Sequence, residues 1–201
     1  MVLDVNMNMV RFSRGEVRDI LVSMVVIAGV FAYVFSGKNI AAALVLLPAT
    51  LITVGLGFVL HEIAHKLMAI RYGYWAEYRL WPEGLLLALV TAYFGFVFAA
   101  PGAVYIHGSY IERDVNGKIS LAGPLTNILL AIMFLMVSTL LPSPLNQVAF
   151  LGYAVNSFLA LFNLIPLAVL DGAKVFRWNP LIWLLAAAAA FGLTFNSMLS
   201  G

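Results

Sequence analysis

The sequence predicts a mainly α-helical, polytopic membrane protein with about five to six transmembrane helices, a small β-hairpin or sheet, and a candidate re-entrant segment. Of its 201 residues, 63% are hydrophobic and only 10% are charged, whereas a soluble domain is about half apolar and about a quarter charged. Several apolar runs also approach or exceed the ~20 residues that a spanning helix needs. We therefore expect residues 1–201 to form a single integral membrane domain.

The composition also excludes several classes of function. The net charge is only +2 and the basic residues are scattered, so the chain has no nucleic-acid-binding signature. The sequence contains no cysteine, so any metal must be held by His, Asp, Glu or Asn. Arg11, Arg14 and Arg18 precede the first apolar run like the start of a signal peptide, but no small-residue cleavage site closes that run. We interpret it as a retained first span, which favours a prokaryotic plasma membrane.

The predicted spans follow from the apolar runs and from the residues that end them. Pro48 indicates either a kink or the true start of the second span, and Pro180 stands at a helix-start position. The predicted spans are Ile20–Phe35, about Ala49–Arg71, Leu121–Leu141, Leu145 to about Pro166, and Pro180–Leu199.

Two regions between the spans predict β-structure. Polar and aromatic residues alternate from Tyr74 to Leu80, which is typical of a short strand. Ala103–Glu112 and Gly117–Leu121 flank the sequence Asp114-Val115-Asn116-Gly117, and Asn-Gly between strand-like runs is a hairpin signal.

The apolar segment Gly84–Ala100 is near the lower length limit for a span. If it crosses the membrane, Lys and Arg are divided almost evenly between the two sides. If it enters and returns, every Lys and Arg except Lys38 lies on one side, as the positive-inside rule favours. We therefore predict a re-entrant segment, with an ordinary extra span as the alternative.

The sequence His61-Glu62-Ile63-Ala64-His65 lies inside the apolar second span, where ionisable groups are costly and therefore functional candidates. Positions four apart share one face of a helix, so His61 and His65 can hold one Zn²⁺ ion. Glu62 lies beside them and can act as a general base on water.

Asp171 is the best candidate for a third ligand. It follows the predicted helix that starts at Leu145. Asp171 and the histidines lie at the same depth in the membrane only if this helix runs parallel to the second span, which requires one membrane crossing between the two helices. Catalytic zinc usually takes three protein ligands and leaves one position open. Asp171 and Glu62 would together balance the charge of the ion. Glu62 would take a proton from water and pass it to a leaving amine, so the predicted reaction is peptide hydrolysis.

With these residues identified, the chain resembles the site-2 proteases, the intramembrane zinc metalloproteases. Three motifs carry the resemblance: His61–His65, the sequence Gly123-Pro124-Leu125-Thr126-Asn127, and Asn163-Leu164-Ile165-Pro166 followed by Leu170-Asp171-Gly172. Ala173 stands where the family often has a second glycine. The resemblance implies a three-helix catalytic core at about residues 49–177, with its active site toward the cytosol. It also implies a membrane-spanning protein as substrate, while the oligomeric state stays open.

Three further residues have two interpretations each. Asn163 is either a donor to the developing oxyanion or a helix cap, and the family resemblance favours the catalytic role. Asn127 either binds the substrate backbone or joins helices. His107 is either a spare metal ligand or, as its strand-like setting favours, a loop histidine. Near it, Ala103–Glu112 could offer a strand edge that pairs with an unwound substrate.

Two other functions compete with an intramembrane zinc endopeptidase. A catalytically silent scaffold of the same family could keep the metal and only bind membrane helices. A metal transporter is disfavoured, because its ionisable groups should be distributed along several spans rather than gathered at one depth.

Overall fold

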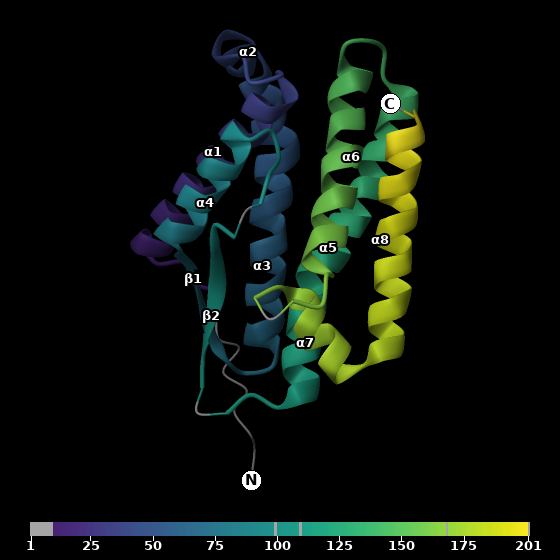
Figure 1. Ribbon diagram of the computed structural model, residues 1–201. Helices are drawn as coiled ribbons and strands as arrows, with labels where there is room; N and C mark the ends of the chain where they lie inside the picture. Colours follow the sequence, from purple (N-terminus) through teal and green to yellow (C-terminus); the bar gives the residue numbers. More distant parts are fainter. Residues whose placement is uncertain (1–9, 99, 109, 168, 201) are drawn as a thin grey trace.

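Helices account for most of the computed structural model, which describes residues 10–98, 100–108, 110–167 and 169–200 (Figure 1). A π-helical turn, Leu51–Gly55, joins the helices Ile40–Thr50 and Leu56–Arg71 without a break. The helices are α1 (Arg14–Phe35), α2 (Ile40–Thr50), α3 (Leu56–Arg71), α4 (Pro82–Tyr93), α5 (Arg113–Leu140), α6 (Leu145–Asn163), α7 (Asp171–Trp178) and α8 (Pro180–Ser200), and the strands are β1 (Trp75–Leu80) and β2 (Gly102–His107).

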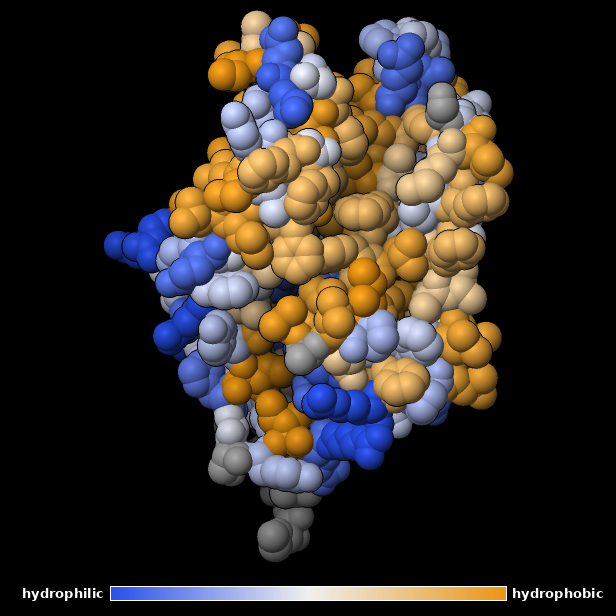
Figure 2. All heavy atoms as spheres, viewed as in Figure 1, coloured by the Kyte–Doolittle hydropathy of each residue, from blue (hydrophilic) through white to orange (hydrophobic). Residues whose placement is uncertain are grey.

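Five helical segments among the described residues are long and apolar enough to cross a membrane. They are α1, the continuous helix Ile40–Arg71, α5, α6 and α8. Apolar side chains cover most of the middle of the face in Figure 2, and hydrophilic ones gather toward its ends. The protein is therefore an integral membrane protein, and the prediction of a mainly helical fold with five to six spans and a small sheet is confirmed.

The second span starts earlier than the predicted Ala49. The side chain of Asn39 accepts a hydrogen bond from the Ala42 N–H and caps the helix that begins at Ile40. Pro48 lies inside this helix and is followed by the π-helical turn. A proline removes one main-chain donor, and a π-helical turn is a common way to accommodate a local irregularity. Pro48 therefore marks an irregularity within the span rather than its start.

The two strands form an antiparallel pair in which Trp75 lies opposite His107 and Leu80 opposite Gly102. The predicted strand Tyr74–Leu80 is confirmed, and the strand predicted from Ala103 ends at His107.

The hairpin predicted around Asn116-Gly117 is wrong, because these residues lie in the first turns of α5. Asp114 lies in the first turn, where the helix dipole favours a negative charge, and its carboxylate is 2.9 Å from the ammonium of Lys118 one turn later. A Cβ at Gly117 would collide with Trp178, so the glycine permits close packing of α5 on α7 instead of forming a turn.

The segment between the strands leaves the sheet and returns to it. α4 has only 12 residues, and the chain reverses at Gly95, whose φ of +91° suits a glycine. The Trp81 N–H then donates to the Pro101 carbonyl at 2.9 Å, so both ends of the segment meet beside the sheet. The structure thus confirms that this segment turns back rather than crossing the bundle.

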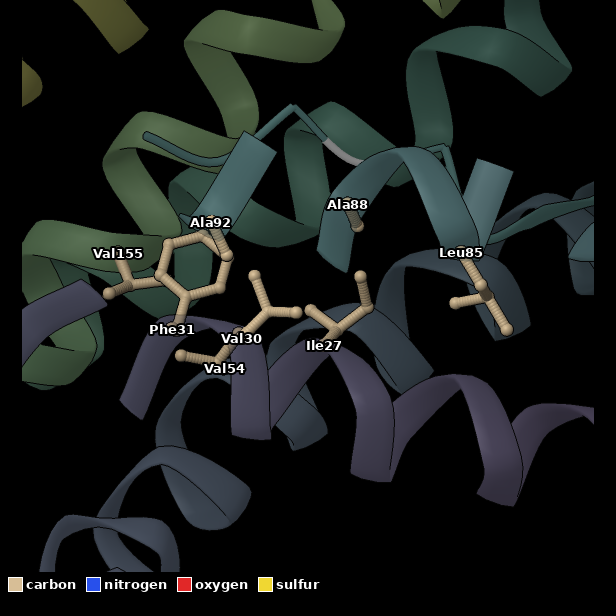
Figure 3. Packing of buried hydrophobic residues seen from close by; sticks show 8 residues of the cluster. All are labelled: Ile27, Val30, Phe31, Val54, Leu85, Ala88, Ala92 and Val155. Carbon is tan, nitrogen blue, oxygen red and sulfur yellow. The ribbon is translucent and has the colours of Figure 1, made fainter. Parts of the chain in front are cut away.

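An apolar cluster packs this returning helix against the bundle (Figure 3). Ile27, Val30 and Phe31 of α1 face Leu85, Ala88 and Ala92 of α4, and Val54 and Val155 complete the cluster from the π-helical turn and α6. Three helices, α5, α6 and α8, lie side by side on the other side of α3 (Figure 1). Because only α5 crosses between them, α3 and α6 run in the same direction, as the position of Asp171 required.

Candidate metal site

Three side chains from two elements converge where α3 approaches the start of α7. His61 and His65 project from successive turns of α3, and Asp171 is the first residue of α7. The two Nε2 atoms are 3.0 Å apart, and Asp171 Oδ2 lies 3.3 Å from Nε2 of His61 and 3.1 Å from Nε2 of His65. Both histidines are buried, and the structure brings together the three side chains that the sequence predicted as ligands.

The other nitrogen of each imidazole is already hydrogen-bonded. Nδ1 of His61 lies 2.5 Å from Oδ1 of Asn127, and Nδ1 of His65 lies 2.8 Å from the carbonyl oxygen of Ile119. These oxygens can only accept, so both Nδ1 atoms must carry the proton. In the neutral rings both Nε2 lone pairs then point toward each other and toward a carboxylate, an arrangement that needs a cation or an extra proton between them.

The donor set fits zinc. Zinc–nitrogen bonds of about 2.0 Å in a tetrahedron place ligand atoms ~3.3 Å apart, close to the three separations at this site. Two imidazole nitrogens and one carboxylate are typical of catalytic zinc. Although burial raises it, His65 and His61 hold the pKa of the Asp171 carboxyl below its usual range when their rings are protonated, so the carboxyl group stays ionised.

Two glycines make the close approach of these elements sterically possible. A Cβ at Gly123 of α5 would collide with the Nε2 atoms of both His61 and His65. A Cβ at Gly172 would collide with the carbonyl oxygen of Leu164, just after α6. Gly123 of the Gly-Pro motif thus lets α5 lie against the two imidazoles, and Gly172 of the Leu-Asp-Gly motif lets the start of α7, which carries Asp171, pack against the chain that follows α6.

Glu62 and Asn163 line the same cavity as the three candidate ligands. The volume of this cavity is about 130 Å³. Glu62 is buried, with 8% of its surface exposed. Asn163 is the last residue of α6, and its Nδ2 donates to the Leu159 carbonyl at 2.9 Å. One Nδ2 hydrogen of Asn163 therefore remains available to another acceptor in the cavity.

The other two candidates have different surroundings. Asn127 is fully buried: its Oδ1 accepts from His61, and its Nδ2 donates to the Gly57 carbonyl and to Asn156 Oδ1. This use of its polar atoms favours the helix-joining interpretation over substrate contact. His107 is exposed at the end of β2 and does not belong to the metal cluster found among the described residues.

Two residues beside this site, Lys174 and Asn156, were not among the predicted site residues. Lys174 lines the cavity, and its ammonium lies 3.7 Å from Oδ1 of Asp171, one helical turn earlier. Asn156 is fully buried against Asn127. A polar residue inside an apolar span was the signal available for Asn156, since such residues are rare there without a partner.

The chain is similar to proteins that are named as putative zinc metalloproteases. The putative zinc metalloprotease MJ0611 of Methanocaldococcus jannaschii is 41% identical over 189 residues, which cover 92% of this chain and 96% of the relative. The putative zinc metalloprotease YwhC of Bacillus subtilis is 29% identical, over 65% of this chain and 68% of the length of YwhC. The putative zinc metalloprotease Rip2 of Mycobacterium tuberculosis is 30% identical, over 56% of this chain and 50% of the length of Rip2. No protein-family model and no solved structure matches the chain.

Proposed function

The chain belongs to the site-2 protease family of zinc metalloproteases, and on this premise we propose that it is an intramembrane zinc endopeptidase. It hydrolyses peptide bonds in or near the transmembrane segments of membrane proteins. The single observation that carries this proposal is the convergence of two Nε2 atoms and one carboxylate oxygen within 3.3 Å of one another inside an apolar bundle.

His61, His65 and Asp171 hold the zinc ion, with both imidazoles fixed by their Nδ1 hydrogen bonds. Bound zinc supplies a Lewis acid that acidifies water and polarises a carbonyl group. Glu62 takes the proton of the attacking water and returns it to the leaving amine. Asn163 donates its free Nδ2 hydrogen to the carbonyl oxygen as negative charge develops there.

The free edge of β2 presents the substrate. In an antiparallel pair, residue pairs that are hydrogen-bonded to each other alternate with pairs that are not. The Trp81–Pro101 hydrogen bond identifies the hydrogen-bonded pairs, so Val104 and Ile106 belong to the other kind and their N–H groups point away from β1. Val104 and Ile106 also line the cavity that holds the ligands. An unwound substrate segment can add to this edge as a further strand, which exposes its peptide bonds beside the ligands.

The opposite edge of the sheet is already used. The Tyr78 N–H donates to Glu16 Oε1 at 3.0 Å, and the Leu80 N–H donates to Asp19 Oδ2 at 3.3 Å. Both carboxylates belong to α1, so α1 covers the outer edge of β1. A substrate strand is therefore directed to β2.

We propose that residues 1–201 act as one domain with a catalytic core at about residues 49–177. The protein lies in a prokaryotic plasma membrane with its active site facing the cytosol. This orientation places every Lys and Arg except Lys38 on the cytosolic side, as the positive-inside rule favours.

The test is cleavage of a single-span membrane protein co-reconstituted with the purified protein in liposomes. Glu62→Gln is expected to abolish cleavage while zinc remains bound, and Asp171→Asn to lose both zinc and cleavage. His107→Ala is the matched control, because it replaces a histidine outside the cluster and is expected to leave both measurements unchanged. Full cleavage by the Glu62→Gln variant would falsify the proposed mechanism. Zinc binding without cleavage in the unmodified protein would favour the silent scaffold, and zinc flux across the liposomes would favour a transporter.

A further inference from the structure

We infer that Asn156 is a positioning residue for His61, acting through Asn127. This inference rests on the proposed zinc site, and it extends that site from its ligands to a buried amide network on α5 and α6. Neither asparagine is itself a zinc ligand in this assignment. Their proposed role is to fix the proton and the orientation of one ligand.

The network is continuous from α6 to the imidazole. Asn156 Oδ1 accepts from Nδ2 of Asn127 at 3.0 Å, and Asn127 Oδ1 accepts from Nδ1 of His61 at 2.5 Å. Asn127 Nδ2 also donates to the Gly57 carbonyl at 3.2 Å. With both Nδ2 hydrogens donated, Asn127 can present only its oxygen to His61. The acceptor on Asn156 therefore helps to select the amide orientation that keeps the proton on Nδ1 of His61.

Asn156 is itself held at two points. Its Nδ2 donates to the Thr53 carbonyl at 3.2 Å and to the Gly152 carbonyl at 2.9 Å. Gly152 lies one turn earlier in α6, whereas Thr53 lies in the π-helical turn, where the regular helical bonding is interrupted. Asn156 thus ties its own helix to the start of the helix that carries the histidines.

These contacts follow one face of the histidine helix. Thr53, Gly57, His61 and His65 are spaced four residues apart, a spacing that keeps successive residues on nearly the same side. A Cβ at Gly57 would collide with Oδ1 of Asn156, so the glycine opens this face to the α6 amide. The face therefore combines two carbonyl acceptors and a glycine with the two candidate ligands.

Burial makes the network sensitive to substitution. Asn127 and Asn156 are both 0% exposed. Loss of the Asn156 amide would leave a hydrogen on Asn127 without an acceptor, and that buried amide would then be free to turn its nitrogen toward His61. Residues that orient a ligand from behind typically change metal affinity about 10- to 100-fold when they are replaced.

The test measures zinc affinity of the full chain in detergent by competition with a fluorescent chelator, with no substrate present. Asn156→Leu removes the hydrogen bonds at similar volume, and Asn156→Ala removes the same hydrogen bonds with a smaller side chain in case the first variant does not fold. Ser157→Ala is the matched control, because Ser157 is a fully buried neighbour that donates only within its own helix, to the Ala154 carbonyl. Thermal unfolding of each metal-free variant separates altered zinc affinity from altered stability.

We expect Asn156→Leu to weaken zinc binding about tenfold and Asn127→Ala more strongly, toward about 100-fold. The double variant should bind no more weakly than Asn127→Ala alone, since Asn156 acts through Asn127. Zinc affinity equal to that of the control in a folded Asn156→Leu or Asn156→Ala variant would overturn the inference, as would fully additive losses in the double variant. Failure of the unmodified protein to bind zinc would overturn the proposed function as well, so the two failures are distinguishable.

Discussion

Lys66 and Glu16 form a buried ion pair in which Nζ lies 2.6 Å from Oε1 and 2.5 Å from Oε2. Both side chains are almost inaccessible, with 2% and 1% of their surfaces exposed. Nζ also donates to the Arg11 carbonyl at 2.7 Å, and Glu16 accepts from the Tyr78 main chain. One pair thus joins α1, α3 and β1 directly beside His65.

Lys66→Met is expected to destabilise the protein by about 3–5 kcal/mol, because it leaves the Glu16 carboxylate buried without its partner. The double variant Glu16→Gln/Lys66→Met should recover part of this loss, since no uncompensated charge remains. Arg18→Gln is the control: Arg18 pairs with Asp19 but is 75% exposed, so its loss should cost at most about 1 kcal/mol. Chemical unfolding in detergent micelles measures all three, and equal stability of Lys66→Met and Arg18→Gln would contradict this account.

Gly123→Ala is expected to abolish zinc binding and cleavage, because the added methyl group occupies the space of the two Nε2 atoms. Gly29→Ala is a matched control in α1, where an added Cβ meets no atom within 4 Å and helix propensity favours alanine. Zinc content after purification and cleavage of the model substrate are the two measurements. A Gly123→Ala variant with full zinc content would show that the ligands can move apart to accept the methyl group.

The convergence of the three candidate ligands was predictable because its signals are local or follow from simple topology. The spacing of His61 and His65 places both on one helix face, and the depth of Asp171 follows from the direction in which each span runs. The return of the segment after Pro82 was predictable from charge, because the alternative divides the basic residues between the two sides.

The errors arose where tertiary contacts override local preference. Asn116-Gly117 is a strong turn signal, but Gly117 is needed where α5 packs against Trp178. The contacts of Asn156 and Asn127 also could not be predicted, because residues far apart in the sequence meet through side-chain orientation. The packing of Gly123 against two imidazoles could not be predicted for the same reason.

Val104→Pro is expected to reduce cleavage strongly without lowering zinc affinity. The substitution removes an N–H that points away from β1, so the pairing of β1 with β2 retains its hydrogen bonds while the free edge loses a donor. Val104→Ala is the control, since it shortens the side chain but keeps the N–H. Cleavage rates and zinc affinities are compared for both variants, and equal cleavage by the two would rule out strand addition at this position.

Cysteine labelling tests how the segment between the strands lies in the membrane. The chain has no cysteine of its own, so single substitutions give unambiguous signals. Glu83→Cys and His107→Cys mark the two ends at exposed positions, and Tyr93→Cys marks the last residue of α4, where the side chain is 69% exposed in the isolated protein. Gly84 is unsuitable, because a side chain there would collide with the Ala100 carbonyl.

Because both ends of the segment meet at the sheet, Glu83→Cys and His107→Cys should react with a membrane-impermeant maleimide from the same face, the cytosolic one. Tyr93→Cys should resist this reagent from either face, since α4 is apolar and packs beside α1 within the bundle. After detergent solubilisation Tyr93→Cys should react, which serves as the control for an accessible thiol. Labelling of the two ends from opposite faces would instead require the segment to cross the membrane, and it would reverse the direction of every later span relative to α3. Asp171 could not then reach the histidines, so this measurement tests the metal site as well as the topology.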